Sequence, residues 1–404
     1  MTRIVFAGGK VFDGNGTPSE TGDVVVENGR IVDVGIGLDG DEVVDATGHT
    51  VLPGMFDCHT HVMFSGSNVL KSLNTPFSLP FYEAIGNLRA TLDAGITSVR
   101  DAMGADLGVA EAVRRGLVAG PRLQIAINMV SQTGGHNDDW MPCGFDVPIM
   151  ANHPGKPNGV GDGPEELRRI VRTLIRMGAD VIKIATSGGV LSPRSNPRHG
   201  QFRDEEVAMV VAEAAAAGVF VMAHAQATDG IKAAARNGVR SVEHGIFLDD
   251  EAIGLMLEHG TWLVPTLTAP RMVLRQAAAG VPIADNVLAK ANSVALQHDE
   301  SVRAAISAGV RIAMGSDSGV GPHGENLDEL PLMVESGLTP AQALHAATRS
   351  AAELLGVADE LGTIEPGKRA DLVLVRGDAE DHATEIGALR KEIQGVWMDG
   401  VRVV

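Results

Sequence analysis

The stretch Pro164-Glu-Glu-Leu-Arg-Arg-Ile-Val-Arg-Thr-Leu-Ile-Arg-Met-Gly-Ala-Asp-Val-Ile-Lys-Ile184 predicts a helix, a glycine and a short strand in that order. Its apolar residues recur at the spacing of one helix face up to Ile175, and Pro164 suits the first helical turn. Gly178 suits the left-handed residue that follows a helix. Residues 181–184, which are apolar except for Lys183, are typical of a parallel strand that helices cover on both faces.

The same unit recurs along the middle of the chain. Between residues 85 and 320, seven glycines each stand between a helix-period stretch and a short apolar run. With the run from Val51 to His61, eight strands are expected, near residues 55–61, 97–103, 122–129, 181–187, 220–225, 241–245, 262–267 and 311–317. Eight alternating β/α units close most simply as a TIM-type (β/α)8 barrel, which is the α/β fold class that we predict.

The two ends of the chain have a different pattern. Short apolar runs separated by turn residues, such as Asn28-Gly29, predict antiparallel strands near residues 24–34 and again near 371–375 and 396–404. We therefore expect a small β-sandwich domain built from both termini, residues 1–53 and 363–404. The metal-binding barrel, residues 54–362, would be inserted between its two parts.

The composition restricts the class of protein. The chain has 404 residues, 44% of them apolar and 21% charged, and a formal net charge of −18. Such an acidic chain is not expected to bind nucleic acid or an anionic membrane. Its two cysteines are too few for a disulfide framework, and we find neither a secretory signal nor a membrane span. We expect a cytoplasmic enzyme with a small-molecule substrate, assembled as a homo-oligomer.

The first barrel strand ends in a pair of potential metal ligands. The sequence Asp57-Cys58-His59-Thr60-His61 places two histidines two residues apart, so both imidazoles lie on one face of the strand. Catalytic side chains of this fold lie at the carboxyl ends of the strands, where two imidazole nitrogens can bind one cation. Asp57 is on the same face one layer deeper and is expected to be a ligand or to support one.

Lys183 is the inward-facing residue of an otherwise apolar fourth strand. A bare ammonium there would be unfavourable and would tend to lose its proton. One interpretation is that Lys183 pairs with a buried carboxylate. The other is that the neutral amine reacts with carbon dioxide, and that the resulting carbamate bridges two metal ions.

Three further strand ends carry ligand types. His224 and His244 end the fifth and sixth strands, and two histidines at equivalent positions are better explained as ligands than as separate core residues. Asp317 follows the eighth strand, where a carboxylate can bind a metal and accept a proton from water. The alternative for Asp317 is that it caps the next helix.

This set of residues resembles the metal-dependent hydrolases of the amidohydrolase superfamily, in particular their binuclear subtype with a carboxylated lysine. Two other stretches, Val51-Leu-Pro-Gly-Met-Phe-Asp-Cys-His-Thr-His61 and Ile364-Glu-Pro-Gly-Lys-Arg-Ala-Asp-Leu-Val-Leu374, are similar to the segments that flank the barrel there. The resemblance implies two divalent metal ions, of which Zn²⁺ fits the ligands best, while Mn²⁺, Co²⁺, Ni²⁺ and Fe²⁺ stay open. It assigns the ligands to the buried metal (His59, His61, Asp317), to the exposed metal (His224, His244) and to both (Lys183 as its carbamate).

The resemblance also implies a mechanism. A hydroxide that bridges the metals would attack the substrate carbonyl, and Asp317 would carry the proton to the leaving amine. We expect His136, in Gln132-Thr-Gly-Gly-His136, to stabilise the oxyanion, or else to bind the loop backbone. Two motifs are similar to those of Xaa-Pro dipeptidases and carboxypeptidase-like members of the superfamily: this Gly-Gly-His and the later Ser187-Gly-Gly-Val-Leu-Ser192. The similarity favours a dipeptide or an N-acyl amino acid as substrate.

Two long loops, residues 130–162 and 187–204, are expected to form the walls of the substrate pocket. The candidates for substrate binding are an arginine for a terminal carboxylate, a glutamine and an aromatic residue, namely Arg194, Arg198, Arg271, Gln226 and Trp140. The same centre could cleave carbamates, ureas, lactones, phosphotriesters or aryl amides of the herbicide or mycotoxin type. A one-metal deaminase or cyclic-amide hydrolase would not need Lys183, and a non-catalytic scaffold would not need all six ligands.

Overall fold

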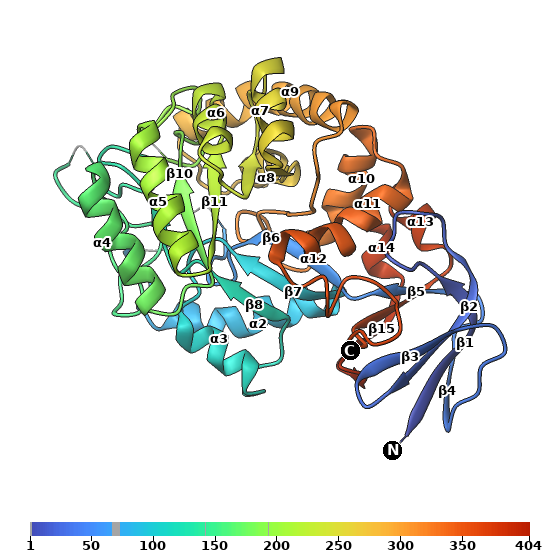
Figure 1. Cartoon of the computed structure of the whole chain (residues 1–404). Helices are drawn as coiled ribbons and strands as arrows, with labels where there is room; N and C mark the ends of the chain where they lie inside the picture. The colour runs from blue at the N-terminus through green and yellow to red at the C-terminus, as the bar shows by residue number, and fades with distance from the viewer. Residues whose placement is uncertain (1, 67–72, 142, 193) are drawn as a thin grey trace.

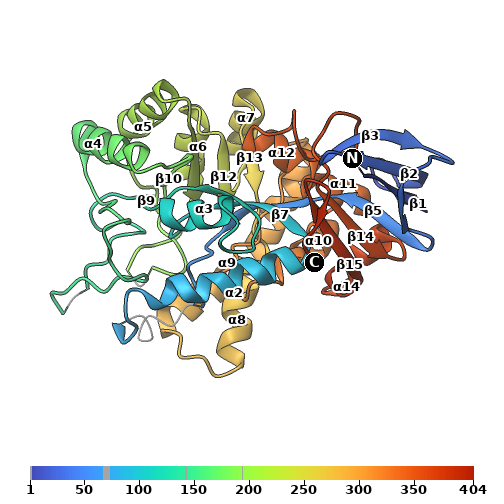
Figure 2. The same cartoon turned by 90° about the horizontal axis from the view of Figure 1, so that it is seen from below.

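The computed structural model describes residues 2–66, 73–141, 143–192 and 194–404. A small β domain contains strands from both ends of the chain, in the order β16-β15-β14-β5-β1-β2-β3 with β4 beside β1. The bounds of these strands are β1 Arg3–Val11, β2 Glu20–Glu27, β3 Arg30–Gly35, β4 Glu42–Asp45, β5 His49–Pro53, β14 Leu372–Arg376, β15 Ile393–Met398 and β16 Val401–Arg402. Figure 2 shows both termini in this domain, at one end of the molecule.

The β domain has the local features that its sequence predicts. Asn28 and Gly29 both have positive φ, 54° and 76°, as a tight hairpin between β2 and β3 requires. Strand β14 pairs with β5 antiparallel and so joins the two termini in one sheet. Phe6 and Trp397 pack edge to face, with ring centroids 4.9 Å apart, in the apolar core of this domain. The further expectation of two packed sheets stays a prediction.

The middle of the chain alternates helices with parallel strands. The strands form two sheets, β6-β7-β8 and β13-β12-β11-β10-β9. Their bounds are β6 Met55–Thr60, β7 Ile96–Asp101, β8 Arg122–Ile125, β9 Met129–Val130, β10 Val181–Ala185, β11 Phe220–Ala225, β12 Ser241–His244 and β13 Trp262–Val264. The helices between and after them are α2 Leu79–Asp93, α3 Leu107–Arg114, α4 Gly163–Arg176, α5 Asp204–Ala216, α6 Thr228–Arg236, α7 Asp250–His259, α8 Thr268–Ala278, α9 Asp285–Ala308, α10 Glu329–Glu335, α11 Pro340–Ala346 and α12 Arg349–Leu355.

The helices lie outside the strands, as Figure 1 shows for α4, α5 and α6 around β10 and β11. Helix α4 has the predicted apolar face, since Leu167, Ile170, Val171 and Leu174 are buried while its arginines stay at the surface. Gly178 follows α4 with a φ of 93°, which confirms the predicted left-handed residue. Two short helices, α13 Ala379–His382 and α14 Ala388–Lys391, follow β14.

The segment 311–318 lies between β13 and β6. Backbone hydrogen bonds join it to Leu263 of β13 on one side and to Cys58 and His59 of β6 on the other. The regular pairing is interrupted between β8 and β9, where Ile127 has a φ of 66°. The alternating α/β organisation is therefore confirmed, whereas closure into one continuous eight-stranded barrel stays a prediction. In the described part of the chain, we find no helix that combines the length and the apolar character needed to cross a bilayer.

Candidate active site

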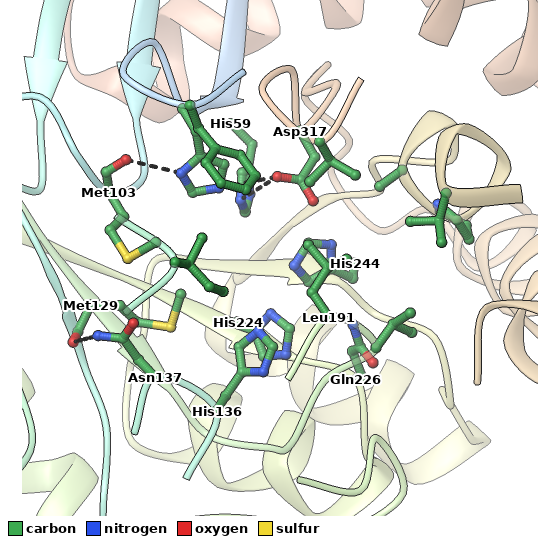
Figure 3. A pocket seen from close by; sticks show the side chains of 18 of the residues that line it. His59, Met103, Met129, His136, Asn137, Leu191, His224, Gln226, His244 and Asp317 are labelled. Carbon is green, nitrogen blue, oxygen red and sulfur yellow. Dashed lines mark hydrogen bonds and ion pairs between the residues drawn. The ribbon is translucent and has the colours of Figure 1, made fainter. Parts of the chain in front are cut away.

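One cavity lies at the carboxyl ends of the parallel strands. It encloses about 850 Å³, including space open to solvent. All six ligands predicted from the sequence line it, together with His136 and Gln226. Figure 3 shows His59, His244 and Asp317 near one another, with His136 and His224 side by side below them. The strand ends therefore bring together residues that are up to 258 positions apart in the sequence.

The histidine pair that ends β6 is held against Asp317. His61 Nε2 lies 3.1 Å from Asp317 Oδ1, and His59 Nε2 lies 3.6 Å from the same oxygen. His59, His244 and Asp317 each offer one ligand atom, and these atoms all lie within 4.8 Å of one another. This spacing suits donors that surround a single cation.

Hydrogen bonds decide which ring nitrogen of each histidine faces the cavity. His61 Nδ1 donates to the Met103 carbonyl at 3.0 Å, and His244 Nδ1 donates to Thr266 Oγ1 at 2.7 Å. Nε2 is therefore the ring nitrogen left to bind a cation, and in His61 it faces Asp317. His224 has the opposite orientation, because its Nε2 donates to the Gly188 carbonyl at 3.1 Å and Nδ1 stays available. A ring whose other nitrogen is fixed in this way is typical of a metal ligand.

The charge states of His59, His224, His244 and Asp317 also suit metal binding. The pKa of His61 is instead raised, because Asp317 outweighs the effect of burial. Burial lowers the pKa of His59, His224 and His244 well below the ordinary value, so the rings are neutral and keep a lone pair. Burial alone would raise the pKa of Asp317, but the neighbouring His59 and His61 lower it to about 2. Asp317 is therefore an ionised carboxylate at neutral pH.

Lys183 is fully buried at the centre of β10. Its Nζ has no hydrogen-bond partner among the described residues, so a close pair with a buried carboxylate is not seen. Burial lowers the pKa of Lys183 to about 8, although Glu243 and Asp317 act in the opposite direction. A buried amine without a partner and with a lowered pKa suits carboxylation, since only the neutral amine reacts with carbon dioxide.

His136 is stacked on the His224 ring, with centroids 4.0 Å apart and planes inclined by 17°. Its Nδ1 is buried and has no partner in the part of the chain that the structure describes. Burial lowers the pKa of His136 to about 3, so this ring is neutral and has one N–H to donate. Gly189 lies directly against the ring, since a Cβ on Gly189 would be 2.2 Å from His136 Cε1.

Of the predicted substrate-binding residues, only Gln226 lines the cavity, and its buried Oε1 has no partner among the described residues. Arg271 donates to both carboxylate oxygens of Asp299 at 2.9 Å, which neutralises its charge. The other three candidates, Arg194, Arg198 and Trp140, are exposed and are not among the residues lining this cavity. Their roles in substrate binding stay predictions.

The cavity wall is more apolar than the sequence predicts. Its apolar lining includes Phe64, Met103, Met129, Ile149, Leu191 and Val273. Apart from Lys183, no lysine or arginine side chain of the described residues lines it. Of these six residues, only Ile149 and Leu191 lie in the two loops predicted to form the pocket walls, and periodicity does not show which loop residues face inward.

Comparison with known proteins gives consistent results over the whole chain. Residues 50–403 match the amidohydrolase family. An ochratoxinase from Aspergillus niger is 34% identical, over 98% of this chain and 85% of the relative. A crystal structure of a Xaa-Pro dipeptidase with methionine in its active site superposes with a TM-score of 0.89 at 33% identity, covering 99% of both chains. A prolidase in complex with N-methylphosphonate-L-proline has a TM-score of 0.89 at 36% identity, covering 100% of this chain and 99% of the other.

Proposed function

The chain belongs to the amidohydrolase family and is a hydrolase that acts on C–N bonds, and from this premise we propose that it cleaves the amide bond of a dipeptide or N-acyl amino acid at a two-metal centre. One observation carries the proposal. Four histidines, Lys183 and Asp317 converge on one cavity, and hydrogen bonds on the far side of the rings leave a nitrogen available to a cation.

The proposed assignment of ligands follows the resemblance to the binuclear subtype of the family. His59, His61 and Asp317 would hold one cation, His224 and His244 the other, and Lys183 as its carbamate would be shared by both. When bound, two divalent cations such as Zn²⁺ lower the pKa of water and polarise a carbonyl group. The unpartnered Nζ of Lys183 and the neutral rings suit this assignment.

Two residues of the chain would move or stabilise charge during the reaction. Asp317, which is ionised, accepts the proton of the attacking water and delivers it to the leaving nitrogen. His136, which is neutral, donates its N–H to the oxyanion that develops on the substrate carbonyl. We also infer that the two parallel sheets and residues 311–318 form a closed (β/α)8 barrel, since that segment bonds to both β13 and β6.

The apolar wall favours a second candidate substrate, an aryl amide of the kind that the name ochratoxinase implies for that relative. Apolar side chains with few polar groups suit an aromatic acyl group better than a small polar residue. Carbamates and ureas remain chemically related alternatives. The buried Lys183 argues against a one-metal deaminase or cyclic-amide hydrolase.

A matched substrate panel tests the proposal. N-acyl amino acids and dipeptides are compared with the same amides lacking the C-terminal carboxylate, beside aryl carbamates and aryl ureas. Preference for the free carboxylate supports the peptidase-like function and makes Arg194→Ala, Arg198→Ala and Arg271→Ala informative variants. Turnover of xenobiotic-like amides alone would refute the peptidase-like function in favour of the second candidate.

A further inference from the structure

Glu243 is a buried carboxylate directly before His244 in β12. Its side chain is fully buried and accepts three hydrogen bonds. Oε2 accepts from His59 Nδ1 at 2.7 Å, and Oε1 accepts from Arg100 Nη2 at 2.9 Å and from Ser241 Oγ at 2.5 Å. All three partners are donors, so the ionised form of Glu243 satisfies every one of them.

Arg100 balances the charge of Glu243 and is itself almost fully buried. Its Nε donates to the Cys58 carbonyl at 2.7 Å, and Nη1 donates to Ser241 Oγ at 3.1 Å. Arg100 comes from β7, Cys58 from β6, and Glu243 from β12. The pair therefore joins three strands beneath the cavity. A buried ion pair that removes two charges from water is not by itself a source of stability, which suggests that it serves another purpose.

His59 differs from the other candidate ligands in the chemistry of its supporting partner. The Nδ1 atoms of His61 and His244 donate to neutral acceptors, the Met103 carbonyl and the Thr266 hydroxyl. His59 donates to an anion. A carboxylate that accepts from one ring nitrogen fixes the tautomer and makes the other nitrogen a stronger donor to a metal. In His59 that other nitrogen is Nε2, which faces Asp317.

We propose that Glu243 is a positioning residue of the metal centre: it accepts from His59 Nδ1 and so directs Nε2 at the cation, and Arg100 pairs with Glu243 and balances its charge. The inference rests on the two-metal centre proposed above. It adds a residue that touches neither substrate nor metal and acts through His59.

The variant Glu243→Gln tests this role. Glutamine has one acceptor and one amide donor where three donors converge, so either His59 or Arg100 loses its acceptor. We expect the affinity for one of the two metals to fall about 10–100-fold, measured by competition with a chelator and by elemental analysis after gel filtration. Glu329→Gln is the matched control, because Glu329 is a second fully buried glutamate that does not contact a candidate ligand.

Each possible result supports or overturns the positioning role of Glu243. Wild-type metal affinity in Glu243→Gln, or an equal loss in Glu329→Gln, overturns the inference. If Glu243→Gln does not fold, the tautomer of His59 is measured directly by ¹⁵N spectra of the histidine-labelled, metal-free wild type. The signal of His59 is assigned as the one that is missing in His59→Gln. A proton on Nδ1 supports the inference and a proton on Nε2 overturns it. A wild-type protein that retains no divalent metal after metal-replete expression would instead refute the metal centre itself.

Discussion

Gly189→Ala should remove His136 from the cavity without changing any residue that contacts substrate. A Cβ on Gly189 would lie 2.2, 2.6 and 2.8 Å from three atoms of the His136 ring, all far inside van der Waals contact. The ring cannot retreat towards His224, because the two rings already stack at 4.0 Å. Gly189 does not have a positive φ, so alanine suits its backbone and the loop can keep its conformation. His136 is therefore the group that moves.

The expected loss follows from the role proposed for His136. Removing one hydrogen-bond donor from an oxyanion site typically lowers kcat about 10²–10³-fold, or about 2.7–4 kcal/mol. We expect a decrease of this size in kcat for Gly189→Ala, with two metals still bound. The control is Gly254→Ala, since a Cβ at this position of α7 meets nothing within 4 Å and kcat should not change. The assay is steady-state hydrolysis of an amide that the wild type cleaves, with metal content measured on the same samples.

A double-mutant cycle shows whether Gly189→Ala acts through His136. If it does, the variant Gly189→Ala/His136→Ala should be no slower than His136→Ala alone, since the donor can be lost only once. Two independent losses that multiply in the double variant would refute the reasoning. So would a wild-type kcat in Gly189→Ala.

Four further outcomes follow from the structure. Lys183→Met keeps the volume of the side chain but removes the amine. Metal content should therefore fall below two ions per chain, and the rate of hydrolysis should fall to background. Full retention of both metals would contradict the carbamate. A chelator at neutral pH should abolish hydrolysis and added Zn²⁺ should restore it, whereas activity that persists in metal-free protein would contradict the two-metal mechanism. Lys290 Nζ donates to three backbone carbonyls of the loop 189–195, which is expected to form a wall of the substrate pocket. Lys290→Met should therefore raise KM more than it lowers kcat. A loss confined to kcat would argue against a role for the loop in substrate binding. Burial raises the pKa of Glu329 from 4.5 to about 7, so the native state holds that proton more tightly and the free energy of unfolding falls as pH rises from about 4.5 to 7. Urea unfolding of the wild type should show a contribution of about 2.5 kcal/mol to this fall between pH 5 and pH 8.5, which Glu329→Gln should remove. An equal effect of Glu329→Gln at both pH values would contradict this.

The sequence was sufficient to place the candidate site because two simple regularities hold. Residues two apart on a strand share a face, and the carboxyl ends of parallel strands meet. His59 and His61 at the end of β6 therefore enter the same cavity as His224 and His244, as the structure shows.

Other features of the site depend on contacts that no local pattern records. His61 is oriented by the Met103 carbonyl and His224 by the Gly188 carbonyl, and any residue type could supply such a backbone acceptor. The charge of an arginine does not show its partner. Arg271 pairs with Asp299, 28 positions away, and only the packing of α8 against α9 determines this pair. The sequence does not predict the contact of Glu243 with His59, because a strand residue next to an inward histidine is expected to face the other way.

The conformation at the strand ends explains that exception. His244, Thr266 and Asp317 all have positive φ, 73°, 52° and 57°, although none is glycine. A left-handed residue breaks the strict alternation of a strand, so Glu243 can face His59 while His244 still enters the cavity. Such residues cost of the order of 1–3 kcal/mol each and persist only where their surroundings hold them. Here the His244 carbonyl accepts from His298 Nε2 at 2.8 Å, and the Asp317 amide donates to the His59 carbonyl at 2.8 Å. The packed strands around these side chains therefore set their orientation. A variant that removes one of these hydrogen bonds should disturb the proposed metal centre before it disturbs the fold.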